Sequence, residues 1–149
     1  MNREEAVDLT KSYAEKRFLC SEAVLLSLCD HLQIRSEIVP RIATGFGAGM
    51  GGQGLVCGAI SGAVMALGIK FGRDNAEKKG NKPYWFTAEF LRRFRREWNR
   101  VTCRELTGCD LTTDAGRKKY DDNELWETKC RKLIATSSEI AYDMIHDTH

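Results

Sequence analysis

Residues 42–69 contain no charged side chain, although charged residues make up 30% of this 149-residue chain. The first part of the stretch, residues 45–54, is dense in glycine, and the remainder consists of small and apolar residues that favour a buried helix. Residues four apart lie on one side of a helix. Small residues occur at that spacing at Gly54, Gly58, Gly62 and Ala66. We therefore expect a central Gly/Ala-rich helix, residues 54–72, with a smooth ridge that another backbone can approach closely.

Three other interpretations of residues 42–69 are weaker. A membrane span needs about 20 predominantly apolar residues, and only residues 55–69 meet that description. The spacing G-x-G-x-x-G occurs from Gly47 and again from Gly49. It indicates a dinucleotide site only after a strand, whereas the preceding residues 37–44 favour a helix. The Gly-Lys-Ser/Thr ending of a phosphate-binding loop is missing, so the glycines are assigned to backbone freedom and close packing.

The composition predicts one domain, residues 1–149, because 42% of the residues are hydrophobic, only two are proline and no segment resembles a linker. Residues 1–16 mix acidic and basic side chains and lack the apolar segment of a secretory signal, which indicates a cytoplasmic protein. The net charge of +2 does not indicate a nucleic acid or a membrane as partner. The basic run in residues 92–104 is interpreted as a solvated helix face.

Apolar residues recur at spacings of three and four along most of the chain, which predicts an all-α protein, a single-domain helical bundle. Candidate caps and stop residues set the boundaries of the elements. The expected helices cover residues 2–17, 21–32, 37–44, 54–72, 83–107 and 121–145. His31, near the end of the second helix, is expected to cap that helix or face solvent. His146 lies near a terminus that is expected to fray and is treated as unimportant.

The chain contains six cysteines and no recognisable export signal. This combination argues for thiol, metal or cluster chemistry rather than a disulfide scaffold. No Cys-x-x-Cys is present, so the usual zinc-ribbon, thioredoxin and haem-attachment motifs are missing. Any one of the cysteines taken alone is better explained as a small buried hydrophobe. The case for a site therefore depends on where the cysteines fall in the predicted helices.

Cys20 and Cys57 fall at predicted helix N-termini. The helix dipole and free N–H groups stabilise a thiolate there, and the thiolate is the reactive and metal-binding form. For Cys57 we expect this effect on the pKa to outweigh burial, which acts in the opposite direction. Cys29 is nine residues from Cys20, or about 900° around one helix, so the two cannot serve one site and Cys29 should act as packing. Cys130 is expected to face inward from the last helix.

Four segments have a recognisable pattern: CSEAV at residues 20–24, IATGFGAGMGGQGLVCGAISGA at 42–63, CRELTGCDL at 103–111, and a last cysteine before a helix ending SEIAYDMI. Over nearly the whole chain they resemble the family of redox-active proteins named for the cysteine pattern C_GCAxxG_C_C. One departure is Val56, which stands where the family name has glycine. The resemblance implies that the family's cysteines are Cys20, Cys57, Cys103, Cys109 and Cys130, with Cys29 an extra.

These observations lead to the hypothesis of thiol/disulfide or metal-cluster electron-transfer chemistry. We expect Cys57 and Cys20 to be the reactive thiols, and an iron–sulfur cluster or a zinc ion to be held by sulfur ligands. The candidate metal ligands are Cys20, Cys57, Cys103, Cys109 and Cys130. A redox protein partner and a homodimer are expected. The alternative is a non-catalytic metal-binding module, or a helical module that dimerises through the glycine ridge. Whether the protein is an oxidoreductase or an electron-transfer protein stays open at this point.

Overall fold

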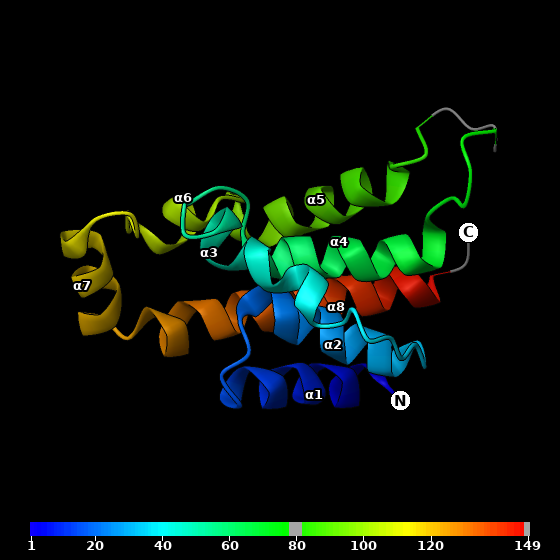
Figure 1. The fold of residues 1–149 in the computed structure, drawn as a ribbon, viewed down its shortest axis with the longest axis horizontal. Helices are drawn as coiled ribbons and strands as arrows, with labels where there is room; N and C mark the ends of the chain where they lie inside the picture. Colours follow the sequence, from blue (N-terminus) through cyan, green and yellow to red (C-terminus); the bar gives the residue numbers. More distant parts are fainter. Residues whose placement is uncertain (78–81, 148–149) are drawn as a thin grey trace.

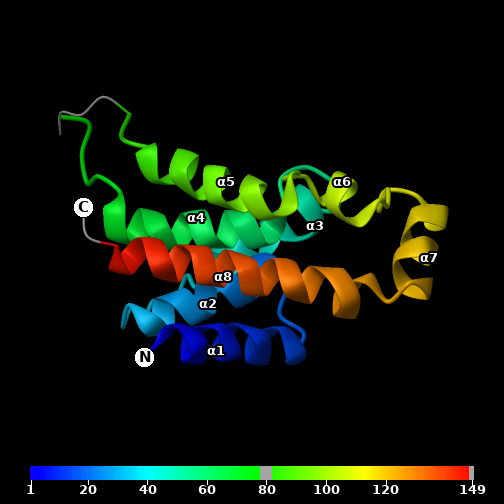
Figure 2. The ribbon, with the colours of Figure 1, turned by 180° about the vertical axis from the view of Figure 1, so that it is seen from behind.

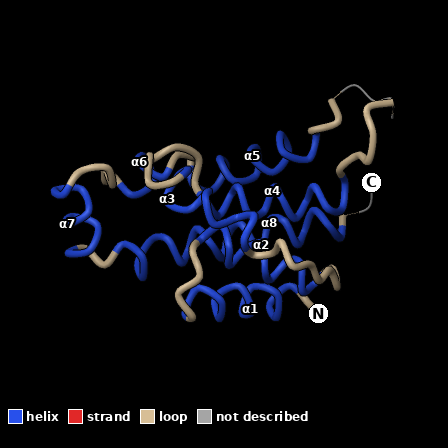
Figure 3. The backbone as a smooth tube through the Cα atoms, in the orientation of Figure 1, coloured by secondary structure: helices blue, strands red, loops and turns tan. Residues whose placement is uncertain are grey.

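The computed structural model describes residues 1–77 and 82–147, which form helices joined by turns and loops (Figure 1, Figure 3). The predicted all-α class is confirmed. The elements are α1 (Arg3–Glu15), α2 (Cys20–His31), the 3₁₀ helix η1 (Arg41–Phe46), α3 (Gly47–Met50), α4 (Gly58–Phe71), α5 (Trp85–Trp98), α6 (Cys103–Thr107), α7 (Asp114–Asp122), the π-helical turn η2 (Trp126–Cys130) and α8 (Arg131–His146).

The long helices lie alongside one another (Figure 1, Figure 2). Helix α2 packs along α4, while α8 contacts α1, α2, α4 and α5. Helix α1 begins and α8 ends at one end of the bundle, and the short helices α3, α6 and α7 lie at the other end (Figure 1). Helices α2, α4 and α8 all start toward the end that carries these short helices. Residues at the starts of these helices therefore come together there.

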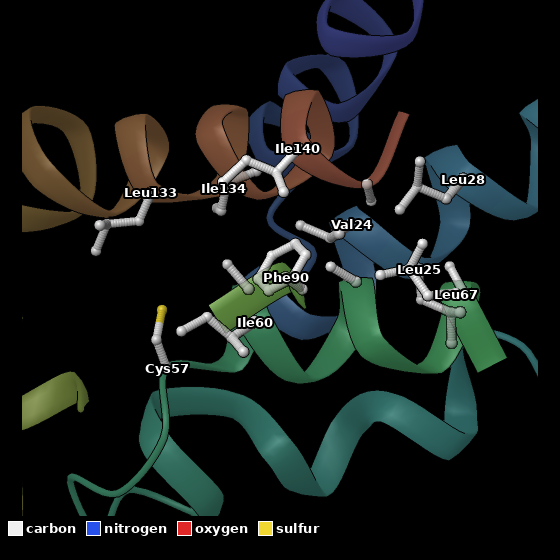
Figure 4. Packing of buried hydrophobic residues seen from close by; sticks show 14 of the residues in the cluster. Val24, Leu25, Leu28, Cys57, Ile60, Leu67, Phe90, Leu133, Ile134 and Ile140 are labelled. Carbon is white, nitrogen blue, oxygen red and sulfur yellow. The ribbon is translucent and has the colours of Figure 1, made fainter. Parts of the chain in front are cut away.

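The hydrophobic core lies between α2, α4, α5 and α8 (Figure 4). Side chains from all four helices are almost completely buried in it: Val24, Leu25, Leu28, Ile60, Leu67, Phe90, Phe94, Leu133, Ile134 and Met144. Burying one such side chain contributes about 1.5–3 kcal/mol. The sulfur of Cys57 points toward Leu133 at one end of this core (Figure 4). The core therefore continues directly into the region where the cysteines lie.

Helices α2 and α4 can approach closely because two glycines of α4 face the start of α2. A methyl group on Gly62 would lie 2.4 Å from the carbonyl oxygen of Ser21, and one on Gly58 would lie 2.4 Å from the sulfur of Cys20. Ser21 is itself fully buried, and its hydroxyl donates a hydrogen bond to the carbonyl of Ala43 at 2.7 Å. Gly58 and Gly62 are thus buried within one chain and do not form a surface that a second copy could use.

The helix expected at residues 54–72 starts later than predicted, at Gly58, with Cys57 as its N-cap residue. The residues before it are extended because they pair with residues 101–104. The N–H of Cys57 donates to the carbonyl of Val101 at 2.8 Å, and the N–H of Cys103 donates to that of Leu55 at 2.7 Å. Helix α4 consequently has 14 residues. None of the helices in the described residues is both long and apolar enough to cross a membrane.

The long helix expected at residues 83–107 is divided into α5 and α6. Asn99 follows the last residue of α5 with a left-handed backbone (φ 68°), a conformation that ends helices. Thr102 then caps α6, and its hydroxyl accepts a hydrogen bond from the N–H of Glu105 at 3.2 Å. The break gives Cys103 a position at a helix N-terminus that the sequence pattern did not predict.

Two further expected helices differ from the structure. At residues 37–44 the chain forms turns and then η1 in place of an α-helix; Pro40 supplies no N–H for a helical hydrogen bond. The helix expected at residues 121–145 is interrupted at Glu124, whose φ of 50° is incompatible with a continuous right-handed helix. Helix α8 begins only after the π-helical turn η2, at Arg131.

Candidate functional site

Four of the six cysteines line one cavity of about 170 Å³ at the end of the bundle that carries the short helices. They are Cys20, Cys57, Cys103 and Cys130. The rest of the wall is mostly apolar: Leu19, Ala48, Gly58, Thr107, Leu111, Tyr120, Trp126 and Leu133. Residues separated by more than 100 positions in the chain thus meet at a single small space.

Each of these cysteines lies at the boundary of a different helix. Cys20 is the first residue of α2, Cys57 is the N-cap of α4, and Cys103 is the first residue of α6. Cys130 is the last residue of η2 and immediately precedes α8. The expected placement of Cys20 and Cys57 at helix N-termini agrees with the structure. The N–H of Ile60 at the start of α4 donates to the carbonyl oxygen of Cys57 at 3.0 Å, and the backbone N–H groups of Ala59 and Ile60 act to lower the pKa of the Cys57 thiol.

Glycines allow the cysteine-bearing segments to come this close. Gly58 touches the Cys20 sulfur, as described above, and a methyl group on Gly49 would lie 2.7 Å from the Cβ of Cys103. Gly49 also has a φ of 69°, within a run of left-handed residues from Ala48 to Gly52. Glycine adopts this conformation without steric cost. The glycine-dense segment is therefore a tight loop that brings backbone against the Cys103 side chain, and Gly58 brings the start of α4 against Cys20.

Burial dominates the acidity of the cavity thiols. It raises the pKa of Cys57 above its ordinary value, even though N–H groups at the start of α4 act in the opposite direction. Burial likewise raises the pKa of Cys20, raises that of Cys103 to about 11 and raises that of Cys130 to about 12. The expectation that the helix terminus would outweigh burial at Cys57 is therefore wrong. With nothing bound in the cavity, these thiols are protonated at neutral pH.

The cavity thiols also influence one another electrostatically. A negative charge on Cys20 would further raise the pKa of Cys57, Cys103 and Cys130. Several thiolates cannot easily coexist in so small an apolar space, because like charges disfavour one another's ionised form. A positively charged group between the sulfurs would remove this penalty.

The remaining two cysteines do not line the cavity. Cys109 is buried just behind it, where its N–H donates to the hydroxyl of Thr107 at 3.2 Å. A charge on Cys109 would still raise the pKa of Cys103 and Cys130, which shows that it is close. Cys29 is buried on another side of α2, where it borders a hollow between α1, α2 and residues 33–39. Of the five candidate ligands, the structure thus brings four together and leaves Cys109 beside them.

Sequence reasoning missed the contribution of the segment that carries α7. Tyr120 lines the cavity, and its hydroxyl oxygen lies 3.1 Å from the sulfur of Cys130. Leu111 and Trp126, on either side of α7, complete this wall. The one signal in the sequence is that Tyr120 is the only aromatic residue in the polar stretch 112–124.

The two histidines considered in the sequence also occupy different surroundings from those expected. The Nε2 atoms of His31 and His146 lie 2.7 Å apart, and the ring of Tyr142 packs against both imidazoles. The pair joins the C-terminal ends of α2 and α8; His31 is half-buried there, whereas His146 stays exposed. Burial, together with the nearby His146 and N-terminal amine, lowers the pKa of His31.

Within residues 1–77 and 82–147, no group of three or more His, Cys, Asp or Glu side chains is arranged so that it could hold a metal ion. All six cysteines are free thiols, with no disulfide between them. The cavity sulfurs therefore surround a space rather than converge on one point.

A family model described as "Putative redox-active protein (C_GCAxxG_C_C)" matches residues 18–144 of the chain. The match covers all six cysteines and every residue that lines the cavity. No curated protein and no solved structure matches the chain.

Proposed function

The chain belongs to the C_GCAxxG_C_C family of redox-active proteins, and we propose that its redox centre is an iron–sulfur cluster held by the four cavity cysteines and used for one-electron transfer. One observation carries this proposal. Cys20, Cys57, Cys103 and Cys130 come from four separate helix boundaries and line the same small apolar cavity. The electrons would be exchanged with a partner protein that carries a one-electron redox group.

The donor set and the shape of the site fit such a group. Four cysteine sulfurs are the usual ligands of both [2Fe–2S] and [4Fe–4S] clusters. A single zinc ion would need its sulfur ligands about 2.3 Å from one point. Sulfurs arranged around a cavity of about 170 Å³ are better suited to a polynuclear centre. The apolar wall would limit access of water, which is one determinant of a cluster's potential.

The surrounding residues would stabilise the thiolates that such ligation requires. Metal binding displaces the thiol protons, which burial otherwise holds on Cys57 and its neighbours. Backbone N–H groups at the start of α4 act to lower the pKa of Cys57, and the N–H of Ala48 acts to lower that of Cys20, so both would offset the negative charge of a thiolate. Bound in this cavity, the cluster would supply a site that accepts and releases single electrons.

Thiol–disulfide exchange is a second candidate. Two neighbouring cavity thiols would form one S–S bond and lose two protons and two electrons, which would reduce a disulfide of a partner protein. The presence of four free thiols at one cavity favours this reaction. The raised pKa of every cavity thiol weighs against it, because the thiolate is the attacking species.

The test is to purify the full chain without oxygen, reconstitute it with iron and sulfide, and measure iron, acid-labile sulfide and visible absorbance. Cys57→Ser should lose the centre, because serine is a poor ligand for soft metals. The matched control is Cys29→Ser, which alters a buried cysteine outside the cavity and should keep it. Equal iron content in these two folded variants, or a wild-type chain that takes up no iron, would exclude the proposed centre. Thiol titration of oxidised and reduced samples would then detect the disulfide alternative.

A further inference from the structure

We propose that Tyr120 is a positioning residue of this centre: its hydroxyl donates a hydrogen bond to the ligating sulfur of Cys130 and thereby raises the reduction potential. The inference rests on the proposed cluster function and assigns to the α7 segment a role in it. Tyr120 would affect the reduction potential of the centre, whereas the four cysteines are required for the centre to form.

The contact has the geometry of a direct hydrogen bond. The hydroxyl oxygen of Tyr120 and the sulfur of Cys130 are 3.1 Å apart, and both side chains line the cavity. As a metal ligand, Cys130 would be a thiolate, which carries no proton and can only accept. The phenolic O–H of Tyr120 must then be the donor.

Tyr120 is the only large side chain of helix α7 that is partly buried. Every residue of α7 is exposed except Gly116 and Tyr120, and the helix stands at the far end of the molecule (Figure 1, Figure 2). A helix with so little buried surface contributes little to the core. Its contribution to the described site is the Tyr120 side chain.

The position of α7 is nevertheless restrained by two contacts with the preceding residues 108–110. Gly116 packs onto the carbonyl of Asp110 so closely that any side chain there would overlap it. The ammonium group of Lys119, next to the tyrosine, donates a hydrogen bond to the carbonyl oxygen of Gly108 at 2.9 Å. These contacts fix α7 against the loop that precedes it and so limit where the Tyr120 side chain can lie.

The acceptor is positioned by an equally specific feature. Cys130 ends the π-helical turn Trp126–Cys130, which leads into α8. A π-helical turn holds one more residue than an α-helical turn, and such turns often occur at functional sites. One residue corresponds to about 100° of rotation, so a regular α-helix through this segment would direct Cys130 elsewhere. Donor and acceptor thus come from two separate irregular segments that meet at one contact.

A hydrogen bond to a ligating sulfur withdraws negative charge from it. The reduced centre carries one more electron than the oxidised one, so the bond stabilises the reduced state more. Hydrogen bonds to the sulfurs are among the features that determine the potential of an iron–sulfur centre. Loss of this bond should therefore lower the midpoint potential while leaving all four ligands present.

The experiment compares Tyr120→Phe with wild type, using the full chain reconstituted anaerobically with iron and sulfide. We expect an unchanged iron content and a lower midpoint potential in a spectroscopic redox titration. The reduced-to-oxidised ratio at fixed potential should fall by up to about tenfold, which is about 59 mV for a one-electron couple. The matched control is Tyr142→Phe, which removes a hydroxyl that bonds the carbonyl of Met1, away from the cavity. Its potential should equal that of wild type.

If Tyr120→Phe does not fold, a second variant tests the role of the hydroxyl group. Substitution of 3-fluorotyrosine at position 120 keeps the ring and strengthens the O–H donor, so it should raise the potential. A potential unchanged in both Tyr120 variants, or lowered equally in Tyr142→Phe, would overturn the inference while leaving the cluster itself in place. A wild-type chain that takes up no iron would overturn the cluster function and this inference together.

Discussion

Replacing Gly62 by alanine tests whether the close approach of α2 and α4 holds the bundle together. A Cβ atom at Gly62 would lie 2.4 Å from the carbonyl oxygen of Ser21 and 3.2 Å from two other backbone atoms of that residue. These are backbone atoms within α2, so no rotation of a side chain can relieve the contact. Gly68 lies in the same helix, and a Cβ atom there would meet nothing within 4 Å. The two glycines therefore form a matched pair.

The expected magnitude follows from two opposing effects. Alanine is favoured over glycine within a helix by about 1 kcal/mol, and this gain applies equally at both positions. At Gly62 the contact must widen by about 0.9 Å, from 2.4 Å to the 3.3 Å of close C···O contacts. Overpacking of this kind costs about 1–3 kcal/mol. Gly62→Ala should therefore be about 1–3 kcal/mol less stable than Gly68→Ala, and Gly68→Ala should be at least as stable as wild type.

The measurement is the free energy of unfolding in denaturant for the three proteins, supported by thermal melting. For a chain of this size, 1 kcal/mol corresponds to about 2–4 °C in Tm. Gly62→Leu should be at least as destabilising as Gly62→Ala, because its larger side chain meets the same backbone. If Gly62→Ala proved as stable as Gly68→Ala, the two helices would have room to spare and the argument from close packing would be refuted.

Three further predictions follow from the site and from the histidine pair. Because the pKa of folded His31 lies below its ordinary 6.5, the neutral ring is favoured by folding; the contribution is present above about pH 6.5 and is lost as pH falls. Unfolding measured from pH 7.5 to pH 5 should show this loss, and His31→Gln should flatten it; equal slopes in both proteins would contradict the assignment. Cys103→Ser should abolish iron binding, whereas Cys109→Ser, outside the cavity lining, should retain it, as measured by iron content. Chelation of iron from the loaded wild-type protein should lower its melting temperature, because a ligand bound only to the folded state stabilises that state; an unchanged Tm would argue against a buried centre.

The sequence alone was sufficient for the features that depend on local pattern. Apolar residues at helical spacing predicted the all-α class, because the period of a helix is a property of consecutive residues. Ser21, as a candidate N-cap, indicated the start of α2 close to its observed position at Cys20, whereas the start expected at Gly54 lies before the observed start of α4 at Gly58. The glycine spacing also predicted a close approach, which Gly58 and Gly62 make with α2.

Other features depended on contacts between distant parts of the chain. The pairing of residues 54–57 with 101–104 moved the start of α4, and the left-handed Asn99 separated α6 from α5. Both changes place a cysteine at a helix boundary beside the cavity. The contact between the Tyr120 hydroxyl and the Cys130 sulfur could not be predicted from the sequence. No regular helical spacing connects the two residues, because the left-handed Glu124 and the π-helical turn η2 lie between them.

The pKa of Cys57 depends both on local sequence and on contacts between distant parts of the chain. Its place at the start of a helix is local, and that place by itself predicts a lowered pKa. Its burial depends on α2, α4, α6 and η2 closing around one cavity, and burial raises the pKa instead. The sequence by itself therefore determined which residue types begin the helices. Only the tertiary structure decided the environment of the thiols, because desolvation depends on all the atoms packed around a group and not on its neighbours in the chain.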